Sequence, residues 1–306
     1  MKQTILITGA SSGFGLLIAN KLHESGYTVI GTSRDPQKYQ SKLPFKLLPL
    51  NIDNDQSIES FGKELFKHIR QLDVLINNAG FYLSGLAEET TIEQGKKQFE
   101  TNFWGTVKLT NVLLPYFRKQ RFGKIITVGS IVGLISLPGG AYYAASKHAL
   151  EGYFRSLRFE LNEFNIKICM VEPMAFKTNI VSNSMVAENK ISDYDVYRKK
   201  LEAYTKDLFS KSQEPTPVID AIIKLLKDKD PKFNHPVGKG ASVILAVEHF
   251  AFKIFENSIV KDVNKAMGNK FKKYFKMPYL MYIWATWNVI AALLLYQKMA
   301  LIMMFF

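Results

Sequence analysis

A chain of 306 residues with 47% hydrophobic and 22% charged side chains is long enough for one large domain or two ordinary ones around a substantial core. Its one cysteine, Cys169, excludes a disulfide within the chain and fits a reducing compartment. The formal net charge of +13 is compatible with nucleic-acid binding, but no helix-turn-helix, zinc-finger spacing or aromatic RNA-binding motif accompanies it, so we expect no nucleic-acid partner.

The N-terminal stretch MKQTILITGASSG reaches a glycine-rich turn after a short apolar run. This run is too short for the hydrophobic segment of a signal peptide. We therefore expect the protein to be made and kept in the cytoplasm.

Short β-rich runs alternate with helical patterns along the first half of the chain. Most of these runs are continuously apolar, as expected for strands buried on both faces of a sheet, and they cover residues 4–8, 28–32, 45–50, 73–77, 124–129 and 166–172. Residues 55–70 repeat apolar side chains at the spacing of a helix that buries one face. The alternation predicts an α/β fold with a doubly wound parallel sheet and right-handed crossovers.

A glycine-rich turn, TGASSGFG, follows the first predicted strand, and Gly9, Gly13 and Gly15 lead from it into a helical run. Glycines let the backbone turn tightly and approach a pyrophosphate, which then lies at the positive end of the helix. The spacing is G-x-x-x-G-x-G rather than the commoner G-x-G-x-x-G. Its strand–turn–helix context predicts a dinucleotide site.

A tyrosine and a lysine four residues apart follow the fifth predicted strand, in the sequence GGAYYAASKHAL. Tyr143 and Lys147 lie on one face of a helix, whereas Tyr142 and Lys147, five residues apart, diverge by about 140°. A neighbouring ammonium group favours the phenolate and so lowers the pKa of a tyrosine. The spacing therefore favours Tyr143 over Tyr142 as a residue that exchanges a proton.

Other chemistries find no support in the motifs. Ser130, in VGSIVG, lacks the G-x-S-x-G turn of a hydrolase nucleophile, and no acid or histidine stands in a recognisable triad order. The histidines lie in separate elements without metal-ligand spacing, so we expect no metal site.

The strand pattern stops after residue 178. Residues 193–209 place tyrosines and leucines at helical spacing, which suits either a helix packed on the main domain or a mobile lid over a ligand, and both interpretations stay open. Residues 213–231 predict a second helix, with Thr216 or Pro217 at its start and a proline beyond its end.

The C-terminal stretch 279–296 carries no formal charge, and its eighteen residues are at the lower limit of a membrane span. Residues 253–276, just before it, contain seven lysines and two acids, a flank that favours an anionic membrane surface. We expect residues 277–306 to contact the cytoplasmic face of a membrane, either spanning it or lying flat on it. A helix buried between copies of the chain is the alternative, and a homo-oligomer stays open.

The glycine turn, the sequence NNAG at 77–80, Ser130 and Tyr143-x-x-x-Lys147 occur in one order along the chain. Together they resemble a short-chain dehydrogenase/reductase of the single-domain type, from Thr4 to about Thr178 and more weakly to about Gly268. SRDP at 33–36 and EPTPVIDAIIKLL further on resemble the hydroxysteroid- and retinol-dehydrogenase-like branch. The resemblance implies a Rossmann-type domain over residues 1–276, with a substrate lid at about 178–214.

The resemblance also implies catalytic roles for four residues. Tyr143 donates the proton in carbonyl reduction, with its pKa lowered by Lys147, and Ser130 donates a hydrogen bond to the reacting oxygen. Asn102, in FETNFWGT, corresponds to an asparagine that holds a water linking the lysine to solvent.

Cofactor contacts follow from the same resemblance. They fall on Thr8, Gly9, Ser11, Ser12, Gly13, Phe14, Gly15, Arg34, Asn51, Ile52, Asn78, Ala79, Gly80, Tyr143, Lys147, Pro173 and Thr178. Ser33 stands where NAD enzymes place an acid, and Arg34 beside it suits a 2′-phosphate, so NADP(H) is favoured over NAD(H). Asp35 could still approach the ribose, and Arg34 could be an exposed loop charge.

Two residues depart from the family pattern. Asn51 stands where an aspartate near the adenine is usual, and its amide oxygen can accept the same hydrogen bond. Met174 replaces a glycine after Pro173, which puts the local backbone and the width of the pocket in question.

These features indicate an oxidoreductase that transfers a hydride between NADP(H) and an alcohol or carbonyl group of an apolar, lipid-, steroid- or retinoid-like substrate. The alternative is a nucleotide-binding membrane scaffold or sensor without turnover. The intact set of Ser130, Tyr143 and Lys147 argues against the alternative.

Overall fold

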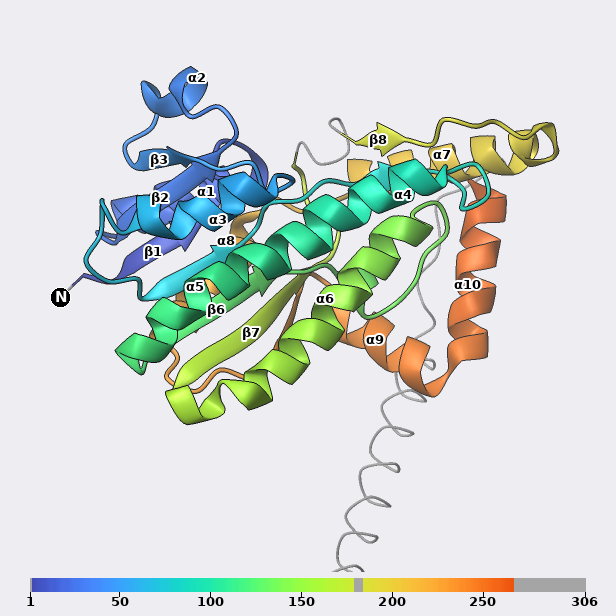
Figure 1. Ribbon diagram of the computed structural model, residues 1–306. Coiled ribbons are helices and arrows are strands. Elements are labelled where there is room, and N and C mark those ends of the chain that lie inside the picture. Colours follow the sequence, from blue (N-terminus) through green and yellow to red (C-terminus); the bar gives the residue numbers. More distant parts are fainter. Residues whose placement is uncertain (1, 179–183, 267–306) are drawn as a thin grey trace, which may run out of the picture.

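Seven parallel strands form the central sheet of the protein, whose computed structural model describes residues 2–178 and 184–266 (Figure 1). The strand order is β3-β2-β1-β4-β6-β7-β9. The strands are β1 (Thr4–Ile7), β2 (Thr28–Ser33), β3 (Lys46–Pro49), β4 (Val74–Asn77), β6 (Gly123–Val128), β7 (Ile166–Pro173) and β9 (Asn234–Val237). The chain runs outward from β1 to β3 and then returns to β4 on the other side of β1. The order therefore reverses between β1 and β4, where sheets of this kind bind ligands.

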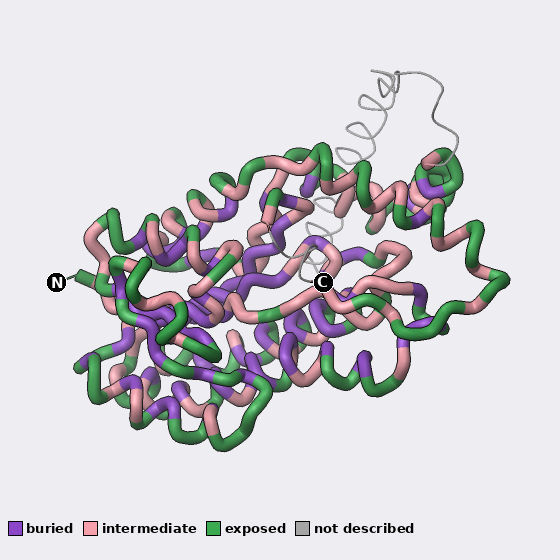
Figure 2. The backbone as a smooth tube through the Cα atoms, turned by 90° about the horizontal axis from the view of Figure 1, so that it is seen from above, coloured by how far each residue is buried: buried purple, intermediate pink, exposed green. Residues whose placement is uncertain are grey.

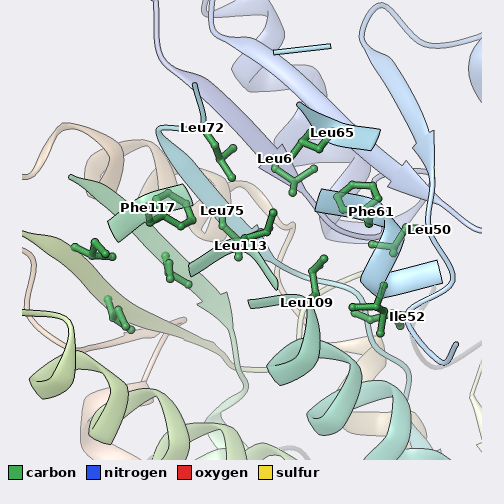
Figure 3. Close-up of a cluster of buried hydrophobic side chains, with 14 of the residues drawn as sticks. Leu6, Leu50, Ile52, Phe61, Leu65, Leu72, Leu75, Leu109, Leu113 and Phe117 are labelled. Atoms are coloured by element: carbon green, nitrogen blue, oxygen red, sulfur yellow. The ribbon is translucent and has the colours of Figure 1, made fainter. Parts of the chain in front are cut away.

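Helices cover both faces of the sheet. On one face lie α1 (Gly13–Glu24) and α8 (Thr216–Lys227), and on the other lie α3 (Asp55–Leu65), α5 (Thr106–Gln120) and α6 (Ala141–Glu160). Neighbouring strand residues point to opposite faces, so Ile5 packs into the core beneath α1 and Leu6 into the core beneath α3 and α5 (Figure 3). The buried residues concentrate along the sheet and the inner sides of these helices (Figure 2).

Helix α3 shows how local sequence produces this packing. The Asn54 side chain accepts a hydrogen bond from the Ser57 N–H at 2.7 Å and so caps the first turn. Ile58, Phe61 and Leu65 then lie on one face and are almost fully buried. Burial of each such side chain contributes roughly 1.5 to 3 kcal/mol.

The strands expected in the first half of the chain are all present, but the prediction that the strand pattern stops after residue 178 is wrong. Strand β9 pairs with β7 at the edge of the sheet, with Met170 opposite Asn234 and Pro173 opposite Val237. Its sequence, Asn-His-Pro-Val, has one fully apolar buried position and a proline, which a sheet accepts at its edge. A second, two-stranded sheet pairs β5 (Leu83–Ser84) with β8 (Met185–Val186).

Five further α-helices of the described chain lie outside these two layers. They are α2 (Gln37–Gln40), α4 (Ile92–Phe99), α7 (Asp195–Ser210), α9 (Ala241–Phe250) and α10 (Phe252–Lys265). The helix expected at 193–209 is α7, and the helix expected at 213–231 is α8. Leu201 of α7 packs against Leu86 and Val263, so α7 lies between the segment after β5 and α10 (Figure 1).

Among residues 2–178 and 184–266, none of the helices combines the length and the apolar character that crossing a bilayer requires. The apolar stretch 277–306 lies outside the described residues, as does part of the expected lid, 179–183.

An ion pair anchors α7 to the segment before α4. The Glu89 side chain is 2% exposed, and its carboxylate accepts hydrogen bonds from Arg198 Nε at 3.0 Å and from the Ile191 N–H at 2.9 Å. Arg198 also donates to the Ile191 carbonyl and to Asp195. The guanidinium holds the pKa of the Glu89 carboxyl below its usual range.

Arg198→Met leaves the Glu89 carboxylate buried without its cation, so we expect it to lower the free energy of unfolding by about 3 kcal/mol. Limited proteolysis should also cut α7 faster. Urea unfolding measures the first effect and timed digestion the second. Lys199→Met, at an exposed neighbour on the same helix, is the matched control. Equal behaviour of the two variants would contradict the anchoring role.

Candidate active site

The carboxyl ends of β1 and β4 are tied together by side chains that the sequence predicts at the site. The Thr8 hydroxyl accepts hydrogen bonds from the Asn78 N–H at 2.8 Å and the Ala79 N–H at 2.9 Å. The Asn78 side-chain amide donates to the Thr8 carbonyl at 2.8 Å. These bonds hold the glycine turn and NNAG side by side at the point where the strand order reverses.

The glycine turn has the backbone shape that the motif predicts. Gly9 and Gly13 have φ angles of +65° and +55°, which favour glycine. A Cβ at Gly15 would overlap the Gly9 carbonyl oxygen, so α1 begins directly against the turn. Its first N–H groups are thus placed as an anion site, as the motif requires. Ser11, Ser12 and Phe14 lie in the same turn, and the Phe14 ring packs edge-on against Phe176 at 6.0 Å.

The end of β2 carries the residues that bear on cofactor choice. Ser33 is buried, and its hydroxyl accepts a hydrogen bond from the Asp35 N–H at 3.3 Å. The Asp35 carboxylate accepts from the Lys38 N–H at 3.4 Å and so is engaged in the turn into α2. Arg34 is exposed and, within the described part of the chain, forms no hydrogen bond or ion pair.

The remaining residues expected at the cofactor lie along the same edge of the sheet. Asn51 follows β3 and accepts a hydrogen bond from the Asp53 N–H at 3.2 Å. The carbonyl of Ile52 abuts Gly105, and a Cβ at Gly80 would lie 3.0 Å from the Asn102 amide oxygen.

Pro173 is the last residue of β7, and Thr178 follows a few residues later. The Met174 N–H donates to the Val237 carbonyl at 2.9 Å, so Met174 continues the pairing with β9. Its side chain lies against Gly238, where a Cβ would approach to 2.9 Å.

Ser130, Tyr143 and Lys147 come together where β6 ends and α6 begins. Lys147 is buried, and its Nζ donates to the Val128 carbonyl at 3.0 Å and lies 5.8 Å from the centre of the Tyr143 ring. The Ser130 side chain is hydrogen-bonded to Tyr143. Tyr142 instead packs its ring onto Gly95 of α4, on a different side of the helix. The structure therefore separates the two tyrosines as helix geometry predicts.

Burial dominates the acid–base properties of this pair. Desolvation raises the pKa of Tyr143 to about 12, against the lowering effect of its hydrogen bond with Ser130. Desolvation also lowers the pKa of Lys147 to about 8, while Glu151 raises it. Among the protein's own groups, burial therefore sets the direction of the Tyr143 pKa shift, and the expectation that Lys147 makes this phenol more acidic stays a prediction for the site with its nicotinamide bound. The ammonium lies beside the ring and directs a hydrogen bond to Val128, so its attraction does not outweigh burial.

Asn102 lies in a π-helical turn, Glu100–Gly105, between α4 and α5. Such turns are rare and are frequent at functional sites. The amide pairs with the backbone of Phe81: Oδ1 accepts from its N–H and Nδ2 donates to its carbonyl, both at 3.0 Å. Nδ2 also approaches the Ser146 hydroxyl on α6 at 3.4 Å. Asn102 thus fixes the segment after NNAG against α6.

Tyr82 is a site residue that the sequence analysis missed. Its ring meets the Tyr143 ring edge-on at 4.9 Å, and its hydroxyl donates to the Gly139 carbonyl at 3.1 Å. The only sequence signal is its position two residues beyond NNAG.

Two buried carboxyl groups were also missed: Glu151, one helical turn after Lys147 on α6, and Glu172 on β7. Asn234 Nδ2 donates to Glu151 Oε2 at 2.8 Å and to Glu172 Oε1 at 2.6 Å. The His235 N–H donates to Glu172 Oε2 at 2.7 Å. Burial and the neighbouring Glu172 raise the pKa of Glu151 to about 8, and burial raises that of Glu172 to about 7.

Comparisons with known proteins agree with this architecture. The family model described as short chain dehydrogenase matches residues 3–189. A 3-ketodihydrosphingosine reductase from Bacteroides thetaiotaomicron is 38% identical over 247 residues, covering 80% of this chain and 91% of that protein. Human retinol dehydrogenase 8 is 32% identical over 251 residues, covering 75% and 79%.

A solved structure of a short-chain dehydrogenase from Streptomyces avermitilis superposes with a TM-score of 0.73 at 29% identity. The match covers 89% of this chain and 99% of that chain. The comparisons confirm the resemblance that the motifs predict, including relatives of the retinol-dehydrogenase type, and the Rossmann-type fold.

The raised pKa values of the two carboxyls predict a stability that depends on pH. The two carboxyl groups bind their protons more tightly in the folded than in the unfolded state. The resulting contribution to the free energy of unfolding is fully present below pH 4.5 and is lost as pH rises through about 7 to 8. Between pH 5 and 8.5 the wild type should lose stability on the order of 2 kcal/mol through the ionisation of Glu172. Glu172→Gln lacks this titration, so its Tm should fall less over the same range. Thermal unfolding at several pH values measures this.

Glu160→Gln, on the exposed side of α6, is the control and should follow the wild-type curve. A Glu172→Gln curve parallel to that of the wild type would contradict the raised pKa values.

Proposed function

The chain belongs to the short-chain dehydrogenase family and is an oxidoreductase, and on that premise we propose that it transfers a hydride between NADP(H) and the CH–OH or carbonyl group of an apolar substrate. The observation that carries the proposal is the meeting of Ser130, Tyr143 and Lys147 at the same edge of the sheet as the glycine turn.

The side chains of this site suit proton delivery to a carbonyl oxygen, while a bound nicotinamide supplies or takes up the hydride. In reduction the neutral phenol of Tyr143 is the acting form, and burial keeps it protonated at neutral pH. The ammonium of Lys147 then stabilises the phenolate that remains. Ser130 donates a hydrogen bond to the oxygen on which charge develops.

The preference for NADP(H) rests on the end of β2. Arg34 is exposed and has its guanidinium available, whereas the Asp35 carboxylate is held in the turn before α2. A guanidinium binds a phosphate through paired, charge-assisted hydrogen bonds.

The apolar substrate class is supported by two observations. The names of two relatives refer to 3-ketodihydrosphingosine and to retinol, both largely hydrocarbon. Leu201 of α7 lies against Gly139, the residue whose carbonyl holds Tyr82 beside Tyr143. In the proposal, α7 is part of a lid over the substrate, and residues 277–306 bring the enzyme to the cytoplasmic face of a membrane.

Tyr143→Phe should lower kcat/KM for carbonyl reduction by about 100-fold or more, because the reacting oxygen loses its proton donor. Tyr142→Phe should change it far less, since that ring packs on α4. Consumption of NADPH with a panel of apolar ketones and aldehydes measures the rates. NADPH fluorescence should show that both variants still bind the cofactor. Equal rates for the two variants would contradict the assignment of Tyr143.

Arg34→Ala should raise KM for NADPH about tenfold, because one charge-assisted contact is lost, and leave KM for NADH nearly unchanged. Lys42→Ala, an exposed charge further along the chain, is the control. A wild-type enzyme that prefers NADH would overturn the cofactor choice while leaving the reaction class intact.

A further inference from the structure

A stripe of functional side chains on α6 continues beyond the catalytic lysine. Tyr143, Lys147, Glu151 and Arg155 are four residues apart in succession and so lie along one face of the helix. The side chain of Glu151 is 6% exposed, and that of Lys147 is equally buried. The acid therefore shares a desolvated environment with the lysine one turn away.

The two oxygens of Glu151 have different surroundings. Oε2 accepts a hydrogen bond from Asn234 at 2.8 Å, whereas Oε1 is buried and has no hydrogen-bond partner among the described residues. Oε1 lies against Gly129, the residue before Ser130, where a Cβ would be 3.3 Å away. A buried, unpaired carboxylate oxygen is costly unless the group is protonated or faces a cation. Arg155 and Lys147 are the cations whose charge favours the Glu151 carboxylate, and Lys147 is the buried one of the two.

The other polar and titratable residues around Glu151 are contributed by three elements. Arg155 lies on α6, Glu172 on β7, and Asn234 and His235 on β9. The His235 contact is made by its backbone N–H, and its ring is turned to the Lys232 carbonyl.

Asn234 couples the two acids. Its Nδ2 donates to both carboxyl groups, and its Oδ1 accepts from Arg155 Nη2 at 2.9 Å, which fixes the orientation of the amide. Ionisation of Glu172 therefore disfavours ionisation of Glu151, since like charges are held close together.

We propose that Glu151, held by Asn234 and coupled to Glu172, is a positioning residue that sets the pH up to which Lys147 keeps its proton and Tyr143 can deliver one. The proposal rests on the proposed function of Tyr143 and Lys147. Glu151 acts through Lys147 and does not touch the substrate.

Substitution of the two acids should have opposite effects. In Glu151→Gln, Lys147 loses the anion that holds its proton at alkaline pH, so it deprotonates earlier. In Glu172→Gln, Glu151 loses the charge that opposes its ionisation, becomes an anion at lower pH and holds the Lys147 proton longer. A purely structural role for the two acids would lower activity in both variants, but would not shift their pH–activity profiles in opposite directions.

The test uses the full chain in two measurements. The first is the pH profile of kcat/KM for NADPH-dependent reduction of an active ketone, from pH 6 to 10. The alkaline limb should move down by about one unit in Glu151→Gln and should move up in Glu172→Gln. The second needs no cofactor: NMR titration of the lysine side-chain ¹³Cε signals, with Lys147 assigned by the signal missing in Lys147→Met. Its midpoint should move in the same two directions.

The control is Glu160→Gln, which makes the same chemical change on the exposed side of α6 and should match the wild type in both measurements. Unchanged midpoints in Glu151→Gln, or shifts of the same sign in both acid variants, would overturn the proposal. If no ketone is reduced even by the wild type, the proposed function fails, whereas the NMR arm still decides whether Glu151 governs Lys147.

Discussion

The site depends on one buried hydrogen bond, from the Lys147 ammonium to the carbonyl of Val128. It joins the second turn of α6 to the end of β6, and so fixes how the helix packs against the strand. Because Ser130 follows that strand and Tyr143 precedes the lysine by one helical turn, the same contact brings hydroxyl, phenol and ammonium together. A buried ammonium group is costly unless further polar groups surround it. The neighbouring hydroxyl and carboxyl groups of the site meet this requirement.

Burial moves the pKa values of two neighbouring members of the α6 stripe, Tyr143 and Lys147, in opposite directions. At Tyr143 it keeps the phenol neutral, the form that gives a proton in the proposed reduction. At Lys147 it weakens the hold on the ammonium proton, and the acid pair of Glu151 and Glu172 lies where it can compensate. Asn102 and Tyr82 supply rigidity on the other side, since their hydrogen bonds fix the segment after NNAG and the start of α6. Catalysis of this kind gains from groups fixed before the substrate arrives.

Features set by local periodicity could be predicted from the sequence. The strands of the first half, the glycine turn with its positive φ angles, and the placement of Tyr143 and Tyr142 on different sides of α6 all follow from spacing within a few residues. Features that depend on distant pairing could not. Glu89 and Arg198 are 109 residues apart in the sequence, and Glu172 and Asn234 are 62 residues apart. No local pattern around these residues predicts that they contact each other. Strand β9 was not predicted because a strand at the edge of a sheet can form with few apolar residues.

The most direct test of the central claim is an absorbance titration of tyrosinate in the complex with NADP⁺, taken as the difference between the wild type and Tyr143→Phe. If Lys147 together with the oxidised cofactor stabilises the Tyr143 phenolate, the difference spectrum should show a phenolate forming well below pH 10, the usual range for tyrosine. The same signal should be absent from Lys147→Met. A wild-type complex with no phenolate below that pH would contradict the account.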